Sequence, residues 1–310
     1  MNELLSTGQT IYALAASPEG VCFAAHAAGL ERSVDGGRTW QSAYASIDAG
    51  QRPFTAAVAL SPAFASDRTV WAGVAGGVLR SDDSGVTWRA GAMQPPPLVS
   101  SLAVSPAYPE DGVVLAGSLE DGVYCSADGG RAWQWWNFGI LDRRVLCLAI
   151  SPAFARDGVV YAGAESGLFR SANGGKAWRE TGLPRELAPV LCLALSPAHE
   201  QDGTLWIGAE HGGLQRSRDR GRTWQRVGAS ALSGAVNAIV LAPTYPAPPH
   251  LLVIHEGALL ISRDDGESWE EWAASPGSAI TAVAAPEGLR PGARILAGLF
   301  DGRVVGLFLS

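Results

Sequence analysis

The sequence SVDGGRTW, residues 33–40, returns five more times in closely related form. The other copies are SDDSGVTW at 81–88, SADGGRAW at 126–133, SANGGKAW at 171–178, SRDRGRTW at 217–224 and SRDDGESW at 262–269. Their first serines are separated by 48, 45, 45, 46 and 45 residues. A nearly constant period of this length indicates a repeat architecture in which each unit packs on its neighbours.

Each repeat contains four short segments that have the character of β-strands. In residues 145–181, the apolar runs VLCLAISP and VVYAGA are joined by the turn AFARDG, and LFRS then leads into the tryptophan turn. Four short strands joined by hairpin turns, repeated about every 45 residues, are typical of propeller blades. The apolar runs are short and show no sustained 3.6-residue period, which argues against a helical solenoid.

The sequence therefore predicts an all-β fold in which a single domain forms a seven-bladed β-propeller with four-stranded antiparallel blades. The last unit has three strand-like segments and no tryptophan turn. Residues 2–7 are expected to supply its fourth strand, which closes the ring and leaves no long sheet edge exposed. The blades are expected at residues 10–44, 54–92, 98–138, 145–181, 190–227, 236–272 and 279–310.

The tryptophan turn is expected to be structural. Its Ser and Asp side chains hydrogen-bond to nearby backbone groups, and the Gly at its fifth position tolerates a positive φ. The Trp packs its ring on its own blade, and the indole N–H finds a partner. Asn173 offers the same hydrogen bonds as aspartate without the charge. The paired positions are Asp35 and Trp40, Asp83 and Trp88, Asp128 and Trp133, Asn173 and Trp178, Asp219 and Trp224, and Asp264 and Trp269.

The consensus Ser-x-Asp-x-Gly-x-Thr-Trp resembles the Asp box, or BNR repeat. This repeat is known from sialidases, xyloglucan-hydrolysing propellers, sortilin-type receptors and photosystem II assembly-factor-like propellers. The resemblance covers essentially the whole chain and implies a propeller, but these families share the turn and not the chemistry. The Arg-Ile-Pro signature of sialidases is missing, the nearest match being Arg52-Pro53. A xyloglucanase-like site needs a cleft between two propellers, whereas this sequence predicts a single propeller.

Composition narrows the classes of partner. A net charge of −7 argues against nonspecific nucleic-acid binding and gives no reason for attraction to an anionic membrane. The N-terminal sequence has no basic segment followed by a long apolar run, so a cytoplasmic protein without membrane insertion is expected, or a secreted one if a leader has been removed. Cys147 and Cys192 hold the same place in successive repeats and are expected in the core. No metal or cofactor site is expected.

Acidic residues in the turns between second and third strands form one candidate binding surface. They are expected on the face away from the tryptophan turns, together with the connections between blades. Such an acidic crown favours a basic protein partner or a cation. Ordinary solvation of exposed turns is the alternative. The acidic residues are Glu120, Asp121, Glu165, Glu210, Glu256 and Asp301, and the histidines His211 and His255 lie beside two of them.

The aromatic segment WQWWNF, residues 133–138, is the second candidate surface. Neighbouring side chains on a strand point to opposite faces, so Trp135 and Trp136 cannot share one layer, and one of them is expected on the surface. Exposed aromatic residues near arginine, here Arg143 and Arg144, are typical of protein interfaces and sugar platforms. Packing against the neighbouring blade is the alternative.

Four arginines directly precede the first serine of a tryptophan turn and are expected to be solvated surface residues, because they repeat with the blade. They are Arg32, Arg80, Arg170 and Arg216. No Ser-His-Asp set, phosphate loop or zinc motif appears. The sequence therefore favours a non-catalytic binding or assembly scaffold for a protein partner. The alternative is a carbohydrate-active protein, either a lectin-like binder or a glycoside hydrolase.

Overall fold

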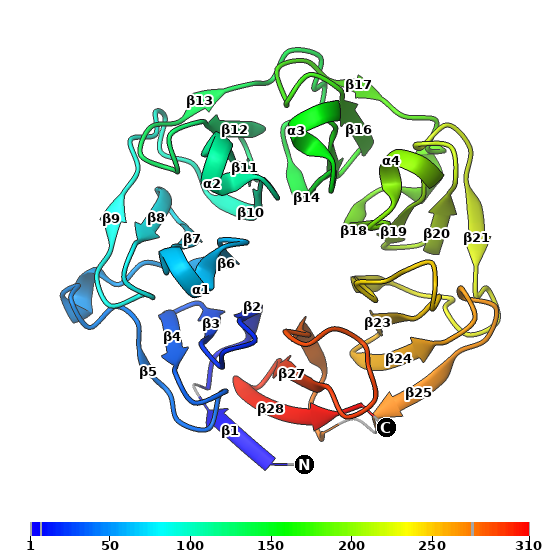
Figure 1. Ribbon diagram of the computed structural model, residues 1–310. Helices are drawn as coiled ribbons and strands as arrows, with labels where there is room; N and C mark the ends of the chain where they lie inside the picture. The colour runs from blue at the N-terminus through cyan, green and yellow to red at the C-terminus, as the bar shows by residue number, and fades with distance from the viewer. Residues whose placement is uncertain (1, 7, 274–275, 310) are drawn as a thin grey trace. The chain divides into compact units, whose positions relative to one another are not determined.

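The computed structural model describes residues 2–6, 8–273 and 276–309. It contains seven four-stranded antiparallel sheets, the blades of a β-propeller (Figure 1). The predicted fold class is confirmed. The chain divides into two compact units, which are Met1–Ala116 with Cys125–Gln134 and Pro276–Ser310, and Gly117–Tyr124 with Trp135–Ser275. The expectation of a single domain stays a prediction.

The first unit contains three complete sheets. In pairing order, the first sheet contains β2 (Ile11–Ala16), β3 (Cys22–His26), β4 (Gly29–Ser33) and β5 (Gln41–Ser42). The second sheet contains β6 (Thr55–Leu60), β7 (Val70–Val74), β8 (Gly77–Ser81) and β9 (Arg89–Ala90). The seventh sheet contains β26 (Ile280–Ala284), β27 (Arg294–Leu299), β28 (Arg303–Phe308) and β1 (Asn2–Ser6). Strand β1 pairs antiparallel with β28, with Asn2 opposite Gly306 and Ser6 opposite Arg303. The N-terminal stretch therefore completes the seventh sheet, as predicted; Thr7 lies outside the described residues.

The second unit also contains three complete sheets. The fourth sheet contains β14 (Val145–Ile150), β15 (Val160–Ala164), β16 (Gly167–Ser171) and β17 (Arg179–Glu180). The fifth sheet contains β18 (Val190–Leu195), β19 (Leu205–Ala209), β20 (Gly213–Ser217) and β21 (Gln225–Val227). The sixth sheet contains β22 (Val236–Leu241), β23 (Leu251–His255), β24 (Ala258–Ser262) and β25 (Glu270–Ala273). The division between units passes through the third sheet, whose strands are β10 (Val99–Val104), β11 (Val114–Ser118), β12 (Val123–Ser126) and β13 (Gln134–Trp135).

Short helices interrupt the all-β pattern where simple turns were expected. The α-helical turns follow the first strand of sheets two to five and are α1 (Phe64–Asp67), α2 (Tyr108–Asp111), α3 (Phe154–Asp157) and α4 (His199–Asp202). Two 3-10 turns, η1 (Ala49–Gln51) and η2 (Arg185–Leu187), lie between sheets. A serine before each helix donates to the aspartate that ends it, as Ser151 Oγ does to Asp157 Oδ2 at 2.7 Å. This bond closes the helical turn and explains why Ser-Pro recurs after the first strand.

The tryptophan turns are held as the sequence predicts. In the first, Ser33 Oγ accepts the Gly37 N–H at 2.7 Å, and Asp35 Oδ1 accepts the Thr39 N–H at 2.9 Å. Asn173 Oδ1 accepts the Ala177 N–H at 2.9 Å, so the fourth turn forms without a carboxylate. Each of the six indole N–H groups donates to a backbone carbonyl.

The tryptophan rings pack between sheets rather than on their own sheet alone. The Trp88 indole donates to the Ala43 carbonyl of the first sheet, and its ring meets Tyr44 edge-on at 5.6 Å. In the second unit, Trp224 packs against a cluster that includes Tyr161 of the fourth sheet and Ile207 of the fifth. The expectation that each ring packs on its own blade is therefore incomplete, because rings also contact the neighbouring sheet. The turns contribute to the core that joins neighbouring sheets.

Candidate functional site

The arginines that precede the tryptophan turns are not solvated surface residues, and that expectation was wrong. Arg216 is 6% exposed, the Arg80 side chain is 12% exposed, and Arg32 and Arg170 are half-buried. They face the junction with the next sheet. The Arg32 Nε–H, for example, donates to the Ser84 carbonyl in the turn of the second sheet. Their repetition marks a structural role at the junctions, because each lies where two sheets pack together.

At these junctions, the backbone carbonyl of the residue at the fourth position of the tryptophan turn accepts a hydrogen bond. In each case the donor is a side chain of the preceding sheet. The donors differ, which shows that the acceptor matters more than the kind of side chain that reaches it. The pairs are Arg32 to Ser84, Trp71 to Gly129, Tyr161 to Arg220, and Arg216 to Asp265.

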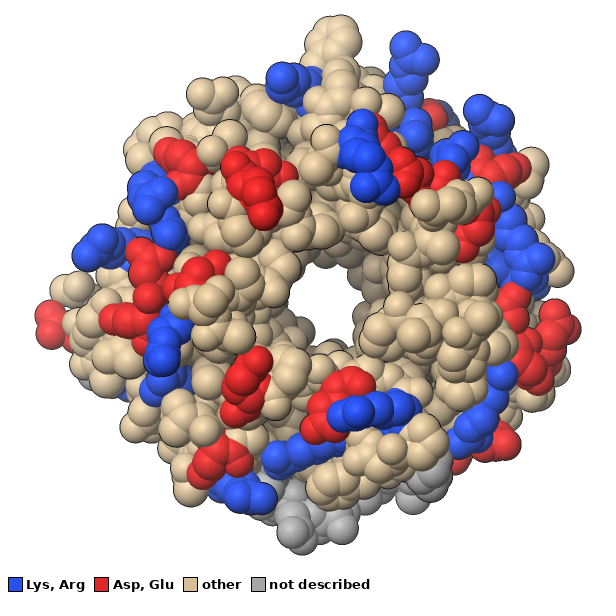
Figure 2. All heavy atoms as spheres, in the orientation of Figure 1, with Lys and Arg blue, Asp and Glu red and all other residues tan. Residues whose placement is uncertain are grey.

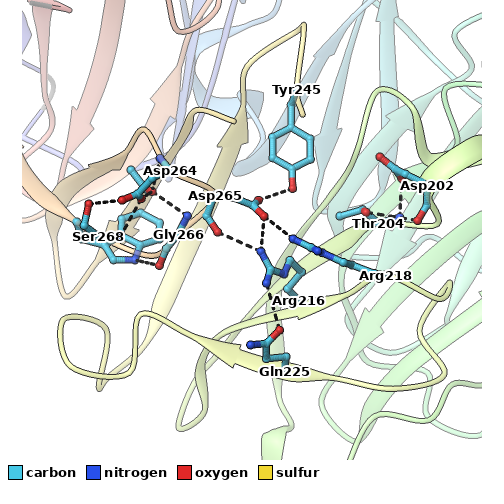
Figure 3. A network of polar contacts seen from close by, with 12 residues as sticks. Asp202, Thr204, Arg216, Arg218, Gln225, Tyr245, Asp264, Asp265, Gly266 and Ser268 are labelled. Atoms are coloured by element: carbon cyan, nitrogen blue, oxygen red, sulfur yellow. Dashed lines mark hydrogen bonds and ion pairs between the residues drawn. The ribbon is translucent and has the colours of Figure 1, made fainter. Parts of the chain in front are cut away.

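The junction of the fifth and sixth sheets is filled by an ionic network (Figure 3). The Asp265 carboxylate pairs with Arg216 at 2.5 Å and with Arg218 at 2.6 Å, and it accepts the Tyr245 hydroxyl at 2.6 Å. The second guanidinium nitrogen of Arg216 donates to Gln225 Oε1 at 3.1 Å. The buried Arg216 therefore has an ionic partner within the chain, and we call this junction the closed junction.

The junction of the fourth and fifth sheets has the same frame but a different charge. Arg220 stands at the turn position that Asp265 occupies in the next copy, and both have a φ of 63°. Arg170, the counterpart of Arg216, donates through Nε to the Tyr161 hydroxyl at 3.2 Å. Arg220 donates to the Glu200 carbonyl at 2.7 Å. Within the described part of the chain, neither guanidinium forms an ion pair.

An open groove lies at this junction, with a volume of about 690 Å³. We call it the basic groove. Four arginines line it together with three acidic residues and Asn173. Asp157 accepts the Ser151 hydroxyl and the Val159 N–H, and Arg156 pairs with Glu200 at 2.5 Å and lowers the pKa of Glu200. Arg156 thus offsets the charge of Glu200, and the four lining arginines outnumber the two remaining carboxylates. The arginines are Arg170, Arg179, Arg220 and Arg222.

The surface around the basic groove is rich in positive side chains. Figure 2 shows blue side chains gathered over β17, α4 and β21, with red ones between them. Lys176 lies with its ammonium 5.6 Å from the centre of the Trp136 ring. The local charge therefore differs in sign from the net charge of the chain, which is −7. Such a local field attracts acidic groups.

A groove of similar size in the first unit carries the opposite charge. It lies between the second and third tryptophan turns and has a volume of about 700 Å³. Arg80 pairs with Asp82 there at 2.5 Å, which leaves Arg131 as its other basic lining residue. The acidic lining residues are Asp67, Asp82, Glu110, Asp111 and Asp128. The basic character of the groove in the second unit is therefore not a general property of the fold.

The residues of the expected acidic crown lie in the turns between second and third strands. Glu165 pairs with Arg144 at 2.6 Å, and Asp301, which belongs to the first unit, pairs with Arg303 at 2.8 Å. Glu120, Glu210, His211 and Glu256 are exposed, Asp121 is half-buried and His255 is 7% exposed. Arginine thus offsets part of the acidic charge. The crown as a binding site stays a prediction.

The aromatic segment of the third sheet reaches the surface. The Trp135 side chain is 52% exposed and Trp136 is half-buried, which confirms that one of the two is a surface residue. Phe138 and Leu141, in the connection that follows, are 81% and 78% exposed. A binding role for this segment stays a prediction.

Cys147 and Cys192 lie in the first strands of two successive sheets, β14 and β18. Cys147 Sγ donates to the Val190 carbonyl at 3.5 Å, and Cys192 Sγ donates to the Val236 carbonyl at 3.3 Å. Burial raises the pKa of Cys192 to about 12, so this thiol stays protonated at neutral pH. Among the described residues, no group of three or more His, Cys, Asp or Glu side chains is placed to hold a metal ion. Nor does the described chain contain a helix long and apolar enough to cross a membrane.

No protein-family model matches the chain, and no curated protein matches it. The structure is similar to the extracellular domain of a putative one component system from B. thetaiotaomicron, with a TM-score of 0.73 and 15% identity over 97% of this chain. This chain spans only 39% of the length of that protein.

Two further structures are similar over nearly the whole chain. YCF48 bound to D1 peptide has a TM-score of 0.72 and 17% identity, covering 100% of this chain and 96% of that one. A GH74 xyloglucanase from Xanthomonas campestris has a TM-score of 0.74 and 18% identity, covering 97% of this chain and 52% of that one. At such identities the likeness shows the fold alone, and that fold is the seven-bladed β-propeller.

Proposed function

We propose that this protein is a non-catalytic binding scaffold that holds an acidic segment of a protein partner in the basic groove. The observation that carries the proposal is the pair Arg170 and Arg220, which meet at a junction where the next copy of the repeat has Arg216 and Asp265. A carboxylate of a partner would occupy the place that Asp265 fills at the closed junction. Arginine suits this role because its planar fork donates two parallel hydrogen bonds to a carboxylate.

The similar structure of YCF48 bound to D1 peptide supports the proposal in one respect. It is a propeller of comparable length that binds a peptide. We also infer that the six tryptophan turns are Asp boxes, in which the aspartate serves the turn and not a ligand. The acidic turns remain a second proposed surface, for a basic partner, and exchange of Glu165, Glu210 and Glu256 for Gln tests it by loss of that partner.

Glycoside hydrolysis has weaker support. It requires a carboxylic acid that holds its proton near neutral pH, and therefore a raised pKa. Within the described ranges, the carboxyl groups whose pKa values move are all moved downward. The cause is a set of hydrogen bonds within the turns, as for Asp219, or a neighbouring arginine, as for Glu200. We therefore favour binding over hydrolysis.

Fluorescence anisotropy with a labelled decaglutamate peptide tests the proposal. We expect binding that weakens as salt is raised, because solvent-exposed ion pairs are screened. The exchanges Arg170→Gln and Arg220→Gln should each weaken binding about tenfold, the effect of losing a charge-assisted hydrogen bond. Exposed Arg38 and Arg131 lie in the first and third tryptophan turns and give matched controls. Equal losses in Arg38→Gln and Arg131→Gln, or no binding by the wild-type protein, would overturn the proposal.

A further inference from the structure

Three large apolar side chains lie exposed in a short segment beside the basic groove. We call Trp135, Phe138 and Leu141 the apolar strap; they are 52%, 81% and 78% exposed. The strap belongs to β13 and to the connection that leads to β14, and all of it lies in the second unit. Single exposed apolar residues are ordinary, but a group of them marks an interaction surface.

The backbone of the strap is fixed at several points. The Phe138 carbonyl accepts the Trp178 N–H at 2.8 Å. Asn137 accepts the Val123 N–H at 2.7 Å through Oδ1 and donates to the Asp121 carbonyl at 2.6 Å through Nδ2.

The ends of the strap are held as well. Asp142 accepts the Ser166 N–H at 2.7 Å, and Trp135 hydrogen-bonds to the Tyr124 hydroxyl. Ile140, between the two exposed positions 138 and 141, is buried. The apolar side chains are therefore presented by an ordered segment, and little ordering entropy has to be lost when a partner binds.

The strap is continuous with the basic groove. Phe138 forms a parallel bridge with Ala177, and Ala177 itself lines the groove together with Arg179. Lys176, the neighbour of Ala177, lies over the ring of Trp136. Bridged strands lie about 5 Å apart, so a bound chain crosses from the groove to the strap within a few residues.

We propose that the strap and the groove form one binding surface, and that the partner segment is acidic and also carries large apolar side chains. This inference rests on the proposed function and specifies its partner. The groove would hold the carboxylates, while the strap would cover the apolar side chains a few residues away. The basic residues along the shared edge, Lys176 and Arg179, match an acidic partner segment.

The test compares two labelled peptides of equal length, decaglutamate and a glutamate peptide that contains one Trp and one Leu. We expect the apolar peptide to bind about tenfold more tightly to the wild-type protein, because burial of even one large side chain contributes that much. In the double variant Phe138→Ser and Leu141→Ser the ratio of the two affinities, which is this advantage, should fall to about one. Val34 and Val86 are 54% and 52% exposed in the first unit, so Val34→Ser with Val86→Ser is the matched control and should keep the advantage.

The outcomes separate the two proposals. If decaglutamate binds but the apolar peptide binds no better, or if the advantage persists in the strap variant, this inference fails and the proposed function stands. If neither peptide binds, the proposed function fails as well. If the strap variant instead loses self-association in sedimentation, or loses binding to phosphatidylcholine–phosphatidylserine vesicles, while the peptide advantage is unchanged, the strap serves another occupant and the inference is overturned.

Discussion

The fourth–fifth and fifth–sixth junctions of this protein are built on the same frame and differ in charge at several equivalent positions, among them the fourth residue of the facing turn. Each has an arginine at the end of a third strand, Arg170 or Arg216, and a turn residue with a φ of 63° facing it. Where that residue is Asp265, the junction is closed by a network of ion pairs. Where it is Arg220, the junction is an open groove.

The difference shows how a repeat gains a binding site without a change of fold. The turn holds its shape through Ser, Asp and Gly at other positions, so its fourth position is free to vary. An acidic residue there satisfies the arginine of the preceding sheet within the chain. A basic residue leaves that arginine for a partner to satisfy. The open junction is therefore expected to bind, and the closed junction is expected to stabilise.

Removal of the Asp265 carboxylate, which pairs with two arginines at the closed junction, should have the largest effect on the unfolding free energy. Asp265→Ala leaves Arg216, which is 6% exposed, without its ionic partner. Loss of one partner of a buried pair costs about 3 kcal/mol of unfolding free energy. Denaturant unfolding measures it. Arg218→Ala, at a 61% exposed side chain that shares the same carboxylate, should cost less than about 1 kcal/mol. Equal effects of the two exchanges would contradict the role given to the closed junction.

Conversion of the open junction into a closed one should weaken peptide binding. Arg220→Asp places a carboxylate where Asp265 stands in the next copy, so Arg170 should pair with it. We expect at least about tenfold weaker decaglutamate binding and an unfolding free energy that is unchanged or raised. Anisotropy and denaturant unfolding on the same sample check both. If the variant binds as the wild type does, the charge at this position does not create the site.

The repeat period predicted the blade count, the tryptophan turns and the completion of the last sheet by residues 2–6. These features depend on local hydrogen bonds and on strand pairing, which spacing and residue type encode. The basic groove was missed for a physical reason. Arg170 and Arg220 lie 50 residues apart and meet only because successive sheets pack side by side.

The regular recurrence of the third-strand arginines also suggested surface positions, whereas they are junction residues. A signal was present at the fourth position of each turn, where only SRDRGRTW has a basic residue. A comparison of that turn position with the third-strand arginine of the preceding repeat indicates the groove. The expectation that function lies on the face away from the tryptophan turns, or on the aromatic strand of the third blade, treated all six turns as equivalent. The proposed site depends on the turn that differs in charge.

Acid should weaken the turns that contain aspartate and spare the one that contains asparagine. Hydrogen bonds from Thr223 lower the pKa of Asp219 to about 2. A lowered folded-state pKa gives stability that is present above the unfolded value of about 4 and is lost as the pH falls toward 2. The unfolding free energy should therefore fall across this window, and Asp219→Asn should reduce the slope. Thermal unfolding at pH 7, 4 and about 2.5 measures it; an unchanged slope would show that this carboxylate is not a source of acid sensitivity.

The smallest expected effect comes from giving the fourth turn the aspartate of its neighbours. In Asn173→Asp, the new carboxylate still accepts the Ala177 N–H, but Ala177 has no hydroxyl to donate a second bond as Thr223 does to Asp219. The unfolding free energy should therefore change by less than about 0.5 kcal/mol. The added negative charge lines the basic groove and should weaken decaglutamate binding about two- to threefold at low salt, with the difference shrinking as salt is raised. The reverse exchange Asp128→Asn is the control and should leave this binding unchanged, because Asp128 lines the groove between the second and third tryptophan turns of the first unit. If Asn173→Asp binds the peptide more tightly, or if its effect does not depend on salt, the groove does not act through its charge.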